Sequence, residues 1–288
     1  MYKVVTKRFL NEAKTICLFE IEAPLAAKHA QAGQFVIFRL DEQGERVPVS
    51  IAGWDREKGT VTVMVQAAGR TTRMLHTVEQ GDYITDFVGP LGKATEMEGL
   101  KKVCVVGGGV GCAIAYPIAK EMHKLGIDVT FIGGFRSADI VILKDELKAA
   151  SDKLIICTDD GSYGEKGFTT KYLQDEIEAN IKEGKPQFDR VIAIGPDIMM
   201  KFLADVTRPY GIKTIISLDP IMVDGTGMCG GCRVIVGGET KFACVDGPDF
   251  DAHEVDFDSL LKRAAFYKEE QDEEAKHICR MTGGHRNG

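Results

Sequence analysis

Three cysteines near the end of the chain, Cys229, Cys232 and Cys244, have a spacing that could hold a metal. A thiolate is a ligand for zinc and for the iron of iron–sulfur clusters, and both centres usually take four protein ligands. The many glycines around the cysteines suit a loop that turns sharply and directs backbone N–H groups at sulfur. The three thiolates therefore predict a site whose fourth ligand comes from another residue. Zinc stays open, although its sites more often use two close pairs and Cys244 stands alone.

A second chemical feature is the glycine run in KKVCVVGGGVG, which ends in Gly108, Gly109 and Gly111 after an apolar strand pattern and before a helical one. Glycine lets a phosphate approach the backbone, and the N-terminus of a helix favours an anion. The run therefore predicts a phosphate-binding turn. It lacks the usual G-x-G-x-x-G spacing, and Pro117 falls inside the expected helix. A plain strand-to-helix turn without a ligand is the alternative.

Two further loops carry glycine, proline and aspartate at the ends of expected strands. Asp159 and Asp160 follow one strand, and Gly195 and Pro196 follow another. Because the carboxyl ends of parallel strands meet at one edge of a sheet, we expect these loops and the glycine turn to line one crevice. The convergence predicts a dinucleotide site.

The kind of dinucleotide stays open. Arg136 follows the second parallel strand and could hold a 2′-phosphate, whereas Asp139 could accept a hydrogen bond from a ribose hydroxyl. The residues therefore do not decide between NAD and NADP.

Two stretches in the first hundred residues could bind a second phosphate-bearing cofactor. The candidates are Arg46, Pro48, Val49 and Ser50 in the first stretch and Gly69, Thr71 and Thr72 in the second. The arginine can neutralise a pyrophosphate, and the second stretch, at an expected helix start, can donate N–H and O–H bonds to it. The alternatives are a surface charge for the arginine and a helix cap for the threonines.

Short strands without intervening helices fill the first hundred residues, which predicts an antiparallel barrel or sandwich. From Gly99, five apolar strands alternate with segments long enough for helices, including one expected helix over 137–151. That alternation predicts a parallel sheet covered on both faces. We therefore expect four parts: a barrel domain at 1–98, a nucleotide-binding α/β domain at 99–217, a cluster-binding segment at 218–250, and a C-terminal helix and tail at 251–288.

Composition limits the classes of partner. The chain has 288 residues, a net charge of -7 and no block rich in lysine and arginine, so neither nucleic acid nor an anionic membrane is expected. No stretch reaches the roughly 18 apolar residues of a membrane span, and we expect a cytoplasmic protein. The remaining cysteines in apolar segments are expected to be buried free thiols: Cys17, Cys104, Cys112 and Cys157.

The barrel and the nucleotide domain together resemble the ferredoxin–NADP reductase superfamily. The family pattern G-x-x-[ST]-x-x-L is met by Gly69, Thr72 and Leu75, while Arg46 lies four residues before Ser50 instead of the usual three. The resemblance implies that the barrel binds FAD and the second domain binds NAD(P).

The cysteine segment resembles the cluster segment of the electron transfer subunit of dihydroorotate dehydrogenase, whose pattern is C-x4-C-x2-C-x(11 to 15)-C. Placed on that pattern, the first ligand falls on Asp224. The resemblance thus implies a [2Fe-2S] cluster held by Asp224, Cys229, Cys232 and Cys244, since a carboxylate carries the charge of a thiolate and can bind iron. Zinc with the same four ligands remains the alternative.

Aspartate at the first position, together with GGGVGCAIAYPIAK and TDDGSYGEKGF, resembles the small-subunit family of NADH-dependent reduced ferredoxin:NADP oxidoreductases, also called sulfide dehydrogenase small subunits. The resemblance implies hydride exchange between NAD(H) and FAD, single-electron transfer through the cluster, and no general base. It also implies a heterodimer with a larger iron–sulfur flavoprotein, in which electron bifurcation occurs. That larger subunit would link the chain to ferredoxin indirectly. Rivals are a dihydroorotate dehydrogenase or sulfide dehydrogenase subunit, an independent flavin reductase, and a zinc-stabilised nucleotide-binding module.

Overall fold

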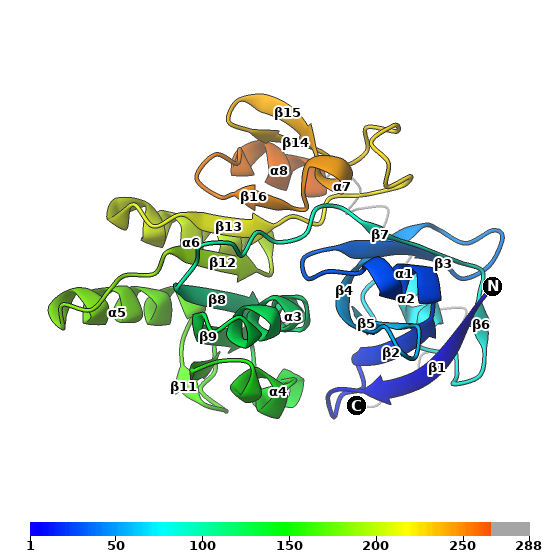
Figure 1. Ribbon diagram of the computed structural model, residues 1–288, viewed down its shortest axis with the longest axis horizontal. Coiled ribbons are helices and arrows are strands. Elements are labelled where there is room, and N and C mark those ends of the chain that lie inside the picture. The colour runs from blue at the N-terminus through cyan, green and yellow to red at the C-terminus, as the bar shows by residue number, and fades with distance from the viewer. Residues whose placement is uncertain (266–288) are drawn as a thin grey trace, which may run out of the picture.

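The N-terminal part of the chain forms a seven-stranded antiparallel sheet that curves into a nearly closed barrel (Figure 1). This is a computed structural model, and it describes residues 1–265. The strand order is β6-β1-β2-β5-β4-β3-β7. The strands are β1 (Tyr2–Phe9), β2 (Ile16–Glu22), β3 (Phe35–Arg39), β4 (Val47–Asp55), β5 (Thr60–Gln66), β6 (Tyr83–Ile84) and β7 (Asp86–Leu91). The predicted antiparallel barrel is confirmed.

Two short helices interrupt the strands. The sequence pattern did not predict the first of them. Helix α1 (Pro24–His29) starts with a proline, whose fixed φ suits the first helical position. Helix α2 (Arg70–Leu75) starts after Gly69, where a helix start was expected. Both are too short to be visible as a helical hydrophobic period.

The second part is a mainly parallel sheet with the order β11-β10-β9-β8-β12-β13-β16. Its parallel strands are β8 (Lys102–Gly108), β9 (Asp128–Phe135), β10 (Lys153–Thr158), β11 (Glu165–Lys166), β12 (Arg190–Ile194) and β13 (Thr214–Ser217). In β8, Val103 and Val105 pack on one side of the sheet, and Cys104 and Val106 on the other. This is the buried, two-sided strand expected of a parallel sheet.

Helices cover both faces of this sheet. Helix α3 (Gly111–Lys124) and helix α4 (Lys144–Ala149) pack in one hydrophobic cluster, and helix α5 (Thr169–Lys182) and helix α6 (Asp197–Thr207) pack in the other. Helix α3 runs through Pro117 without ending there. The parallel α/β domain predicted from the strand–helix alternation is confirmed.

The single helix expected over 137–151 is wrong. The segment forms a 3-10 turn (Ala138–Ile140) and then α4, and the two are separated at Leu143, whose φ is +56°. The side chains of Val141, Ile142 and Leu143 are buried. Burial of this apolar run outside a helix outweighs the weak helix propensity of its β-branched residues.

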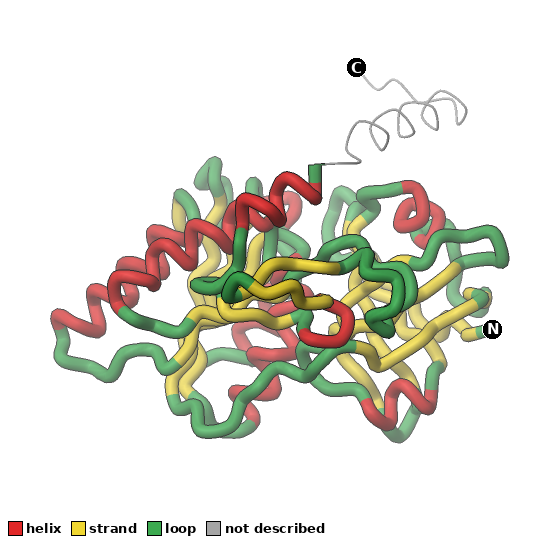
Figure 2. The backbone as a smooth tube through the Cα atoms, turned by 90° about the horizontal axis from the view of Figure 1, so that it is seen from above, coloured by secondary structure: helices red, strands yellow, loops and turns green. Residues whose placement is uncertain are grey.

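The last part of the described chain is a small unit that lies over the boundary between the other two (Figures 1 and 2). It contains the hairpin β14 (Arg233–Val236) and β15 (Glu239–Phe242), then α7 (Ala243–Asp246), β16 (Asp249–Asp251) and α8 (Phe257–Ala264). Strand β16 pairs antiparallel with β13 and so attaches the unit to the parallel sheet. Residues 266–288, which carry Cys279 and the rest of the expected C-terminal helix, lie outside the described residues.

Contacts also attach this unit to the barrel. The Lys93 N–H donates to the Gly247 carbonyl at 2.7 Å, and the Thr95 hydroxyl donates to the Asp249 carboxylate at 2.6 Å. A Cβ on Gly225 would lie within 3 Å of the side chains of Ile37 and Leu91. The unit therefore packs closely on both neighbours. Within residues 1–265 no helix is long and apolar enough to cross a bilayer.

Candidate functional site

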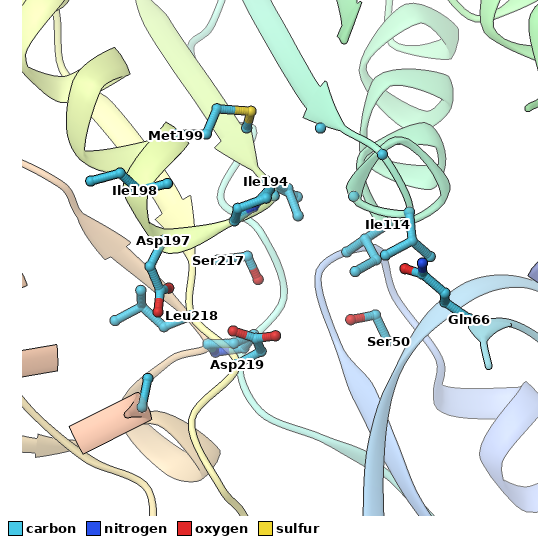
Figure 3. A pocket seen from close by; sticks show the side chains of 18 of the residues that line it. Ser50, Gln66, Ile114, Ile194, Asp197, Ile198, Met199, Ser217, Leu218 and Asp219 are labelled. Atoms are coloured by element: carbon cyan, nitrogen blue, oxygen red, sulfur yellow. The ribbon is translucent and has the colours of Figure 1, made fainter. Parts of the chain in front are cut away.

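One cleft of about 1650 Å³ joins the three parts of the chain (Figure 3). Most residues predicted to bind the nucleotide or flavin line it: Pro48, Val49, Ser50, Gly108, Gly109, Gly111, Asp159, Gly195 and Pro196. The segment 217–223, which leads into the cysteine loop, lines the same cleft. The tertiary structure therefore brings together candidates that are far apart in the sequence.

The glycine turn between β8 and α3 is built for close backbone approach. Gly109 has φ +55°, and its N–H donates to the Gly134 carbonyl at 2.8 Å. A Cβ on Gly111 would lie 2.3 Å from the Ile194 carbonyl oxygen, because β8 and β12 are neighbours. The turn leaves the N-terminus of α3 facing the cleft, where N–H groups can bind a phosphate.

The two aspartates in the loop after β10 lie in different surroundings. Asp159 lines the cleft. The Asp160 carboxylate instead accepts hydrogen bonds from the Ser162 N–H at 2.9 Å and the Ser162 hydroxyl at 2.6 Å. The Ser162 hydroxyl and N–H hold the pKa of Asp160 below its usual value. Asp160 is thus engaged within its own loop, outside the residues that line the cleft.

On the barrel side, β4 presents Pro48, Val49 and Ser50 to the cleft, whereas Arg46 is not among the residues that line it. The Arg46 Nε donates to the Val223 carbonyl at 2.6 Å. This contact connects the start of β4 to the cysteine segment. A role for Arg46 on a pyrophosphate stays a prediction.

The second barrel stretch does not line the cleft, and its hydroxyls already have protein partners. The Thr72 hydroxyl accepts from the Gly69 N–H at 3.0 Å and so caps α2. The Thr71 hydroxyl donates to the Glu45 carboxylate at 2.5 Å. The Thr72 bond is the helix cap that we considered as the alternative, whereas Thr71 bonds a side chain outside the helix, and a flavin role for the stretch stays a prediction.

Three of the four candidate cluster ligands, Asp224, Cys229 and Cys232, lie in the loop before β14, and Cys244 lies in α7, after the β14–β15 hairpin. The Asp224 carboxylate accepts the N–H groups of Thr226, Met228 and Cys229 at 2.9, 3.0 and 2.7 Å, and these donors, Thr226 first, lower the pKa of Asp224. The Cys232 Sγ accepts the Cys244 N–H at 3.4 Å.

The loop also offers donors to sulfur. The Cys229 Sγ accepts the Gly231 N–H at 3.4 Å, and Cys229 is exposed whereas Cys232 and Cys244 are buried. Three glycines in the loop, Gly225, Gly227 and Gly230, have positive φ. Three thiols and a carboxylate with nearby N–H donors suit a [2Fe-2S] cluster, which spreads its ligands over two irons. Among residues 1–265 no three histidine, cysteine or acidic side chains converge as the ligands of one metal ion.

Two cleft residues were missed in the sequence. Asp197 begins α6, and Asp219 follows β13. Each comes directly after a strand end, which is the only signal that could have indicated them. Desolvation by the surrounding protein, followed by the negative charge of Asp197, raises the pKa of Asp219 to about 6, although Asp219 is exposed to solvent in the open cleft. Burial also raises the pKa of Asp197, whose Oδ1 is buried without a hydrogen-bond partner.

Comparison with known proteins agrees with this architecture. Residues 219–256 match the family model of the iron–sulfur cluster binding domain of dihydroorotate dehydrogenase B. The chain is 46% identical over 271 residues to a dihydroorotate dehydrogenase B (NAD(+)) electron transfer subunit homolog from Thermotoga maritima, covering 94% of each protein. It is 34% identical over 244 residues to a probable electron transfer subunit of the same enzyme from Methanocaldococcus jannaschii, covering 85% of this chain and 87% of that protein.

Solved structures agree as well. The structure of an NADH-dependent reduced ferredoxin-NADP oxidoreductase, determined in work on flavin-based electron bifurcation, matches with a TM-score of 0.87 and 44% identity over 96% of this chain and 98% of that chain. A ferredoxin-NADP+ reductase from Plasmodium falciparum shares the fold at 14% identity and a TM-score of 0.56, over 72% of this chain and 88% of that chain. The resemblance predicted from the sequence is confirmed.

Proposed function

This chain belongs to the family of dihydroorotate dehydrogenase B electron transfer subunits and their homologues. We propose that it works as an electron transfer subunit of a flavin and iron–sulfur oxidoreductase. It exchanges a hydride between NAD(H) and FAD and passes single electrons through a [2Fe-2S] cluster. The observation that carries the proposal is the single cleft lined by the glycine turn, by β4 of the barrel and by the segment leading to the cysteine loop.

Each side of the cleft has its own task. The turn at Gly108, Gly109 and Gly111 binds the pyrophosphate of NAD(H) with N–H groups and the positive end of α3. Pro48, Val49 and Ser50 hold the flavin against the barrel. FAD, when bound, exchanges hydride with nicotinamide and can also give up electrons one at a time, as a cluster requires. The chain therefore orients its cofactors and keeps water from them, and needs no general base.

The cluster is held by Asp224, Cys229, Cys232 and Cys244. The donor set, the N–H groups near the sulfurs and the match of residues 219–256 to the cluster-binding family model support this assignment. The Arg46 contact to Val223 connects the loop to the strand that faces the flavin. The cluster segment is accordingly held near the cleft through which electrons arrive.

The partner is a larger iron–sulfur flavoprotein, with which the chain forms an NADH-dependent ferredoxin:NADP oxidoreductase that bifurcates electrons. The similarity to the solved structure at 44% identity supports this choice. Four exposed apolar side chains in and around the cysteine loop offer a surface for such a subunit: Ile221, Val223, Met228 and Val245. The family relatives favour one alternative, a dihydroorotate dehydrogenase catalytic subunit.

The experiment is purification from the native host without oxygen, followed by visible spectroscopy during addition of NADH. We expect flavin and cluster absorption, loss of the flavin band with NADH, and a change in the cluster bands. A colourless protein, or a flavin that NADH does not reduce, would refute the function.

The identity of the co-purified polypeptide tests which larger subunit is the partner. A larger subunit that reacts with NADP and ferredoxin supports bifurcation, and one that oxidises dihydroorotate supports the alternative. NADH oxidation without any second polypeptide would contradict a subunit role.

A further inference from the structure

One peptide group in the cysteine loop, residues 224–232, is hydrogen-bonded on both of its sides. This peptide joins Gly230 to Gly231. Its N–H, on Gly231, donates to the Cys229 Sγ at 3.4 Å, and its carbonyl, on Gly230, accepts from the Arg233 Nη1 at 3.4 Å. The C=O and N–H of a trans peptide point in opposite directions, so the sulfur and the guanidinium lie on opposite sides of one planar group.

The backbone of the loop and of the hairpin after it holds this arrangement. Gly230 has φ +67°, a conformation that glycine adopts without steric cost. A Cβ on Gly231 would lie 3.5 Å from the Cys229 Sγ, so this part of the loop already lies close to the sulfur. Arg233 is the first residue of β14 and pairs with Phe242 of β15. The hairpin therefore fixes the backbone from which the arginine reaches the loop.

A second arginine beside the loop has a different relation to the sulfurs. The Arg263 Nη2, on α8, donates to the Gly231 carbonyl at 3.1 Å. The N–H of that peptide belongs to Cys232, and within residues 1–265 it donates to no sulfur. Both arginines are exposed and line the cleft. The two side chains thus bring the same charge to one loop, but only Arg233 is connected to a sulfur through a single peptide.

We propose that Arg233 is a positioning residue that raises the reduction potential of the cluster by polarising the peptide between Gly230 and Gly231. The inference deepens the proposed function and rests on its cluster assignment. A cation on the carbonyl makes the N–H of the same peptide a stronger donor, because hydrogen bonds in a chain polarise one another. The Cys229 sulfur gains negative charge when a bound cluster takes up one electron, and a stronger donor stabilises that charge. The electron comes from the reductant, and no covalent bond forms or breaks.

The test is a redox titration of the holoprotein with dithionite and mediators, followed by EPR of the reduced cluster. The variants are Arg233→Gln and Arg263→Gln. Arg208→Gln is the matched control, because Arg208 is also exposed and also donates at 3.4 Å to a backbone carbonyl of this small unit, that of His253, which lies outside the cysteine loop. Iron content and thermal unfolding show whether each variant is folded and loaded.

Wild type and Arg208→Gln should have the same cluster potential. In Arg233→Gln the ratio of reduced to oxidised cluster at a fixed potential should fall about fivefold, which is a shift of about 40 mV at about 59 mV per factor of ten. The shift in Arg263→Gln should be smaller, because its peptide donates to no sulfur.

Three results overturn this inference and leave the cluster assignment intact. They are an unchanged potential in Arg233→Gln, an equal shift in Arg263→Gln, and loss of iron from Arg233→Gln without a shift in the cluster that remains. In the last case the arginine only holds the loop. Absence of a reduced-cluster signal from the wild type overturns the cluster assignment, and this inference with it.

Discussion

A single methyl group on Gly111 should disable the nucleotide turn. In Gly111→Ala the new Cβ would lie 2.3 Å from the Ile194 carbonyl oxygen and 2.9 Å from the Gly195 Cα, and both are backbone atoms that cannot rotate away. Ordinary contact at about 3.4 Å requires the turn and β12 to separate by about 1 Å. Such overpacking typically costs about 1–3 kcal/mol of unfolding free energy.

The same displacement weakens ligand binding. A shift of about 1 Å carries an N–H···O bond of about 2.9 Å beyond hydrogen-bond range. Loss of one bond to a charged phosphate, about 1.5–3 kcal/mol, corresponds to roughly 10- to 150-fold weaker NAD+ binding. Calorimetric titration of the oxidised holoprotein with NAD+ measures this loss, and thermal unfolding measures the stability.

Gly126→Ala is the matched control at the other end of α3. Gly126 has φ +78° with no atom within 4 Å of an added Cβ, so alanine there adds backbone strain of about 1–2 kcal/mol but no collision. This variant should unfold more easily and bind NAD+ normally. Wild-type NAD+ affinity in Gly111→Ala, or equal loss in the control, would refute the reasoning that the turn binds the phosphates.

Three further predictions concern the cluster loop and a buried acid. Asp224→Ala should lose the cluster absorption, whereas Asp224→Cys, which supplies a thiolate but not the two carboxylate oxygens that accept the loop N–H groups, should keep iron at a shifted potential; an unchanged cluster in the alanine variant contradicts the ligand assignment. Burial raises the pKa of Asp249 to about 6, so its carboxylate destabilises the fold increasingly from about pH 4 to about pH 6, by at most about 3 kcal/mol. Asp249→Asn should therefore raise the melting temperature at about pH 8 more than at about pH 5, and an equal change at both values contradicts this. Arg46→Gln removes the bond to Val223 and should speed iron release to a chelator about fivefold, unlike Arg56→Gln, which removes a bond to the Ala30 carbonyl within the barrel; equal rates in the two variants count against a role for the Arg46 contact.

Features that depend on neighbours in the chain could be predicted from the sequence. The glycine turn needs only a strand, a tight turn and a helix in succession, and Gly108 to Gly111 supply it within a few residues. The spacing of Cys229, Cys232 and Cys244 similarly indicates a metal loop, because its ligands lie in one short segment. The barrel and the parallel sheet follow from strand and helix periodicity for the same local reason.

The helix expected over 137–151 could not be predicted correctly from local sequence patterns. The apolar spacing of Val141, Ile142 and Leu143 is compatible with a helix face, but in the fold these side chains are buried as a non-helical connection. The choice depends on the space beside α3 and the sheet, which no local pattern encodes.

Only the tertiary structure decided which residues share the cleft. It connects Arg46 to Val223 at the start of the cysteine segment, and it places Asp197 and Asp219 in one cleft although they belong to different strand–loop units. Parallel strands bring their carboxyl ends to one edge, where desolvation by the surrounding protein and then the negative charge of Asp197 raise the pKa of Asp219. Sequence therefore determined which chemistry is available in each loop, whereas the packing of three units determined which of those groups act on one another, since desolvation and electrostatic interaction depend on distance in space.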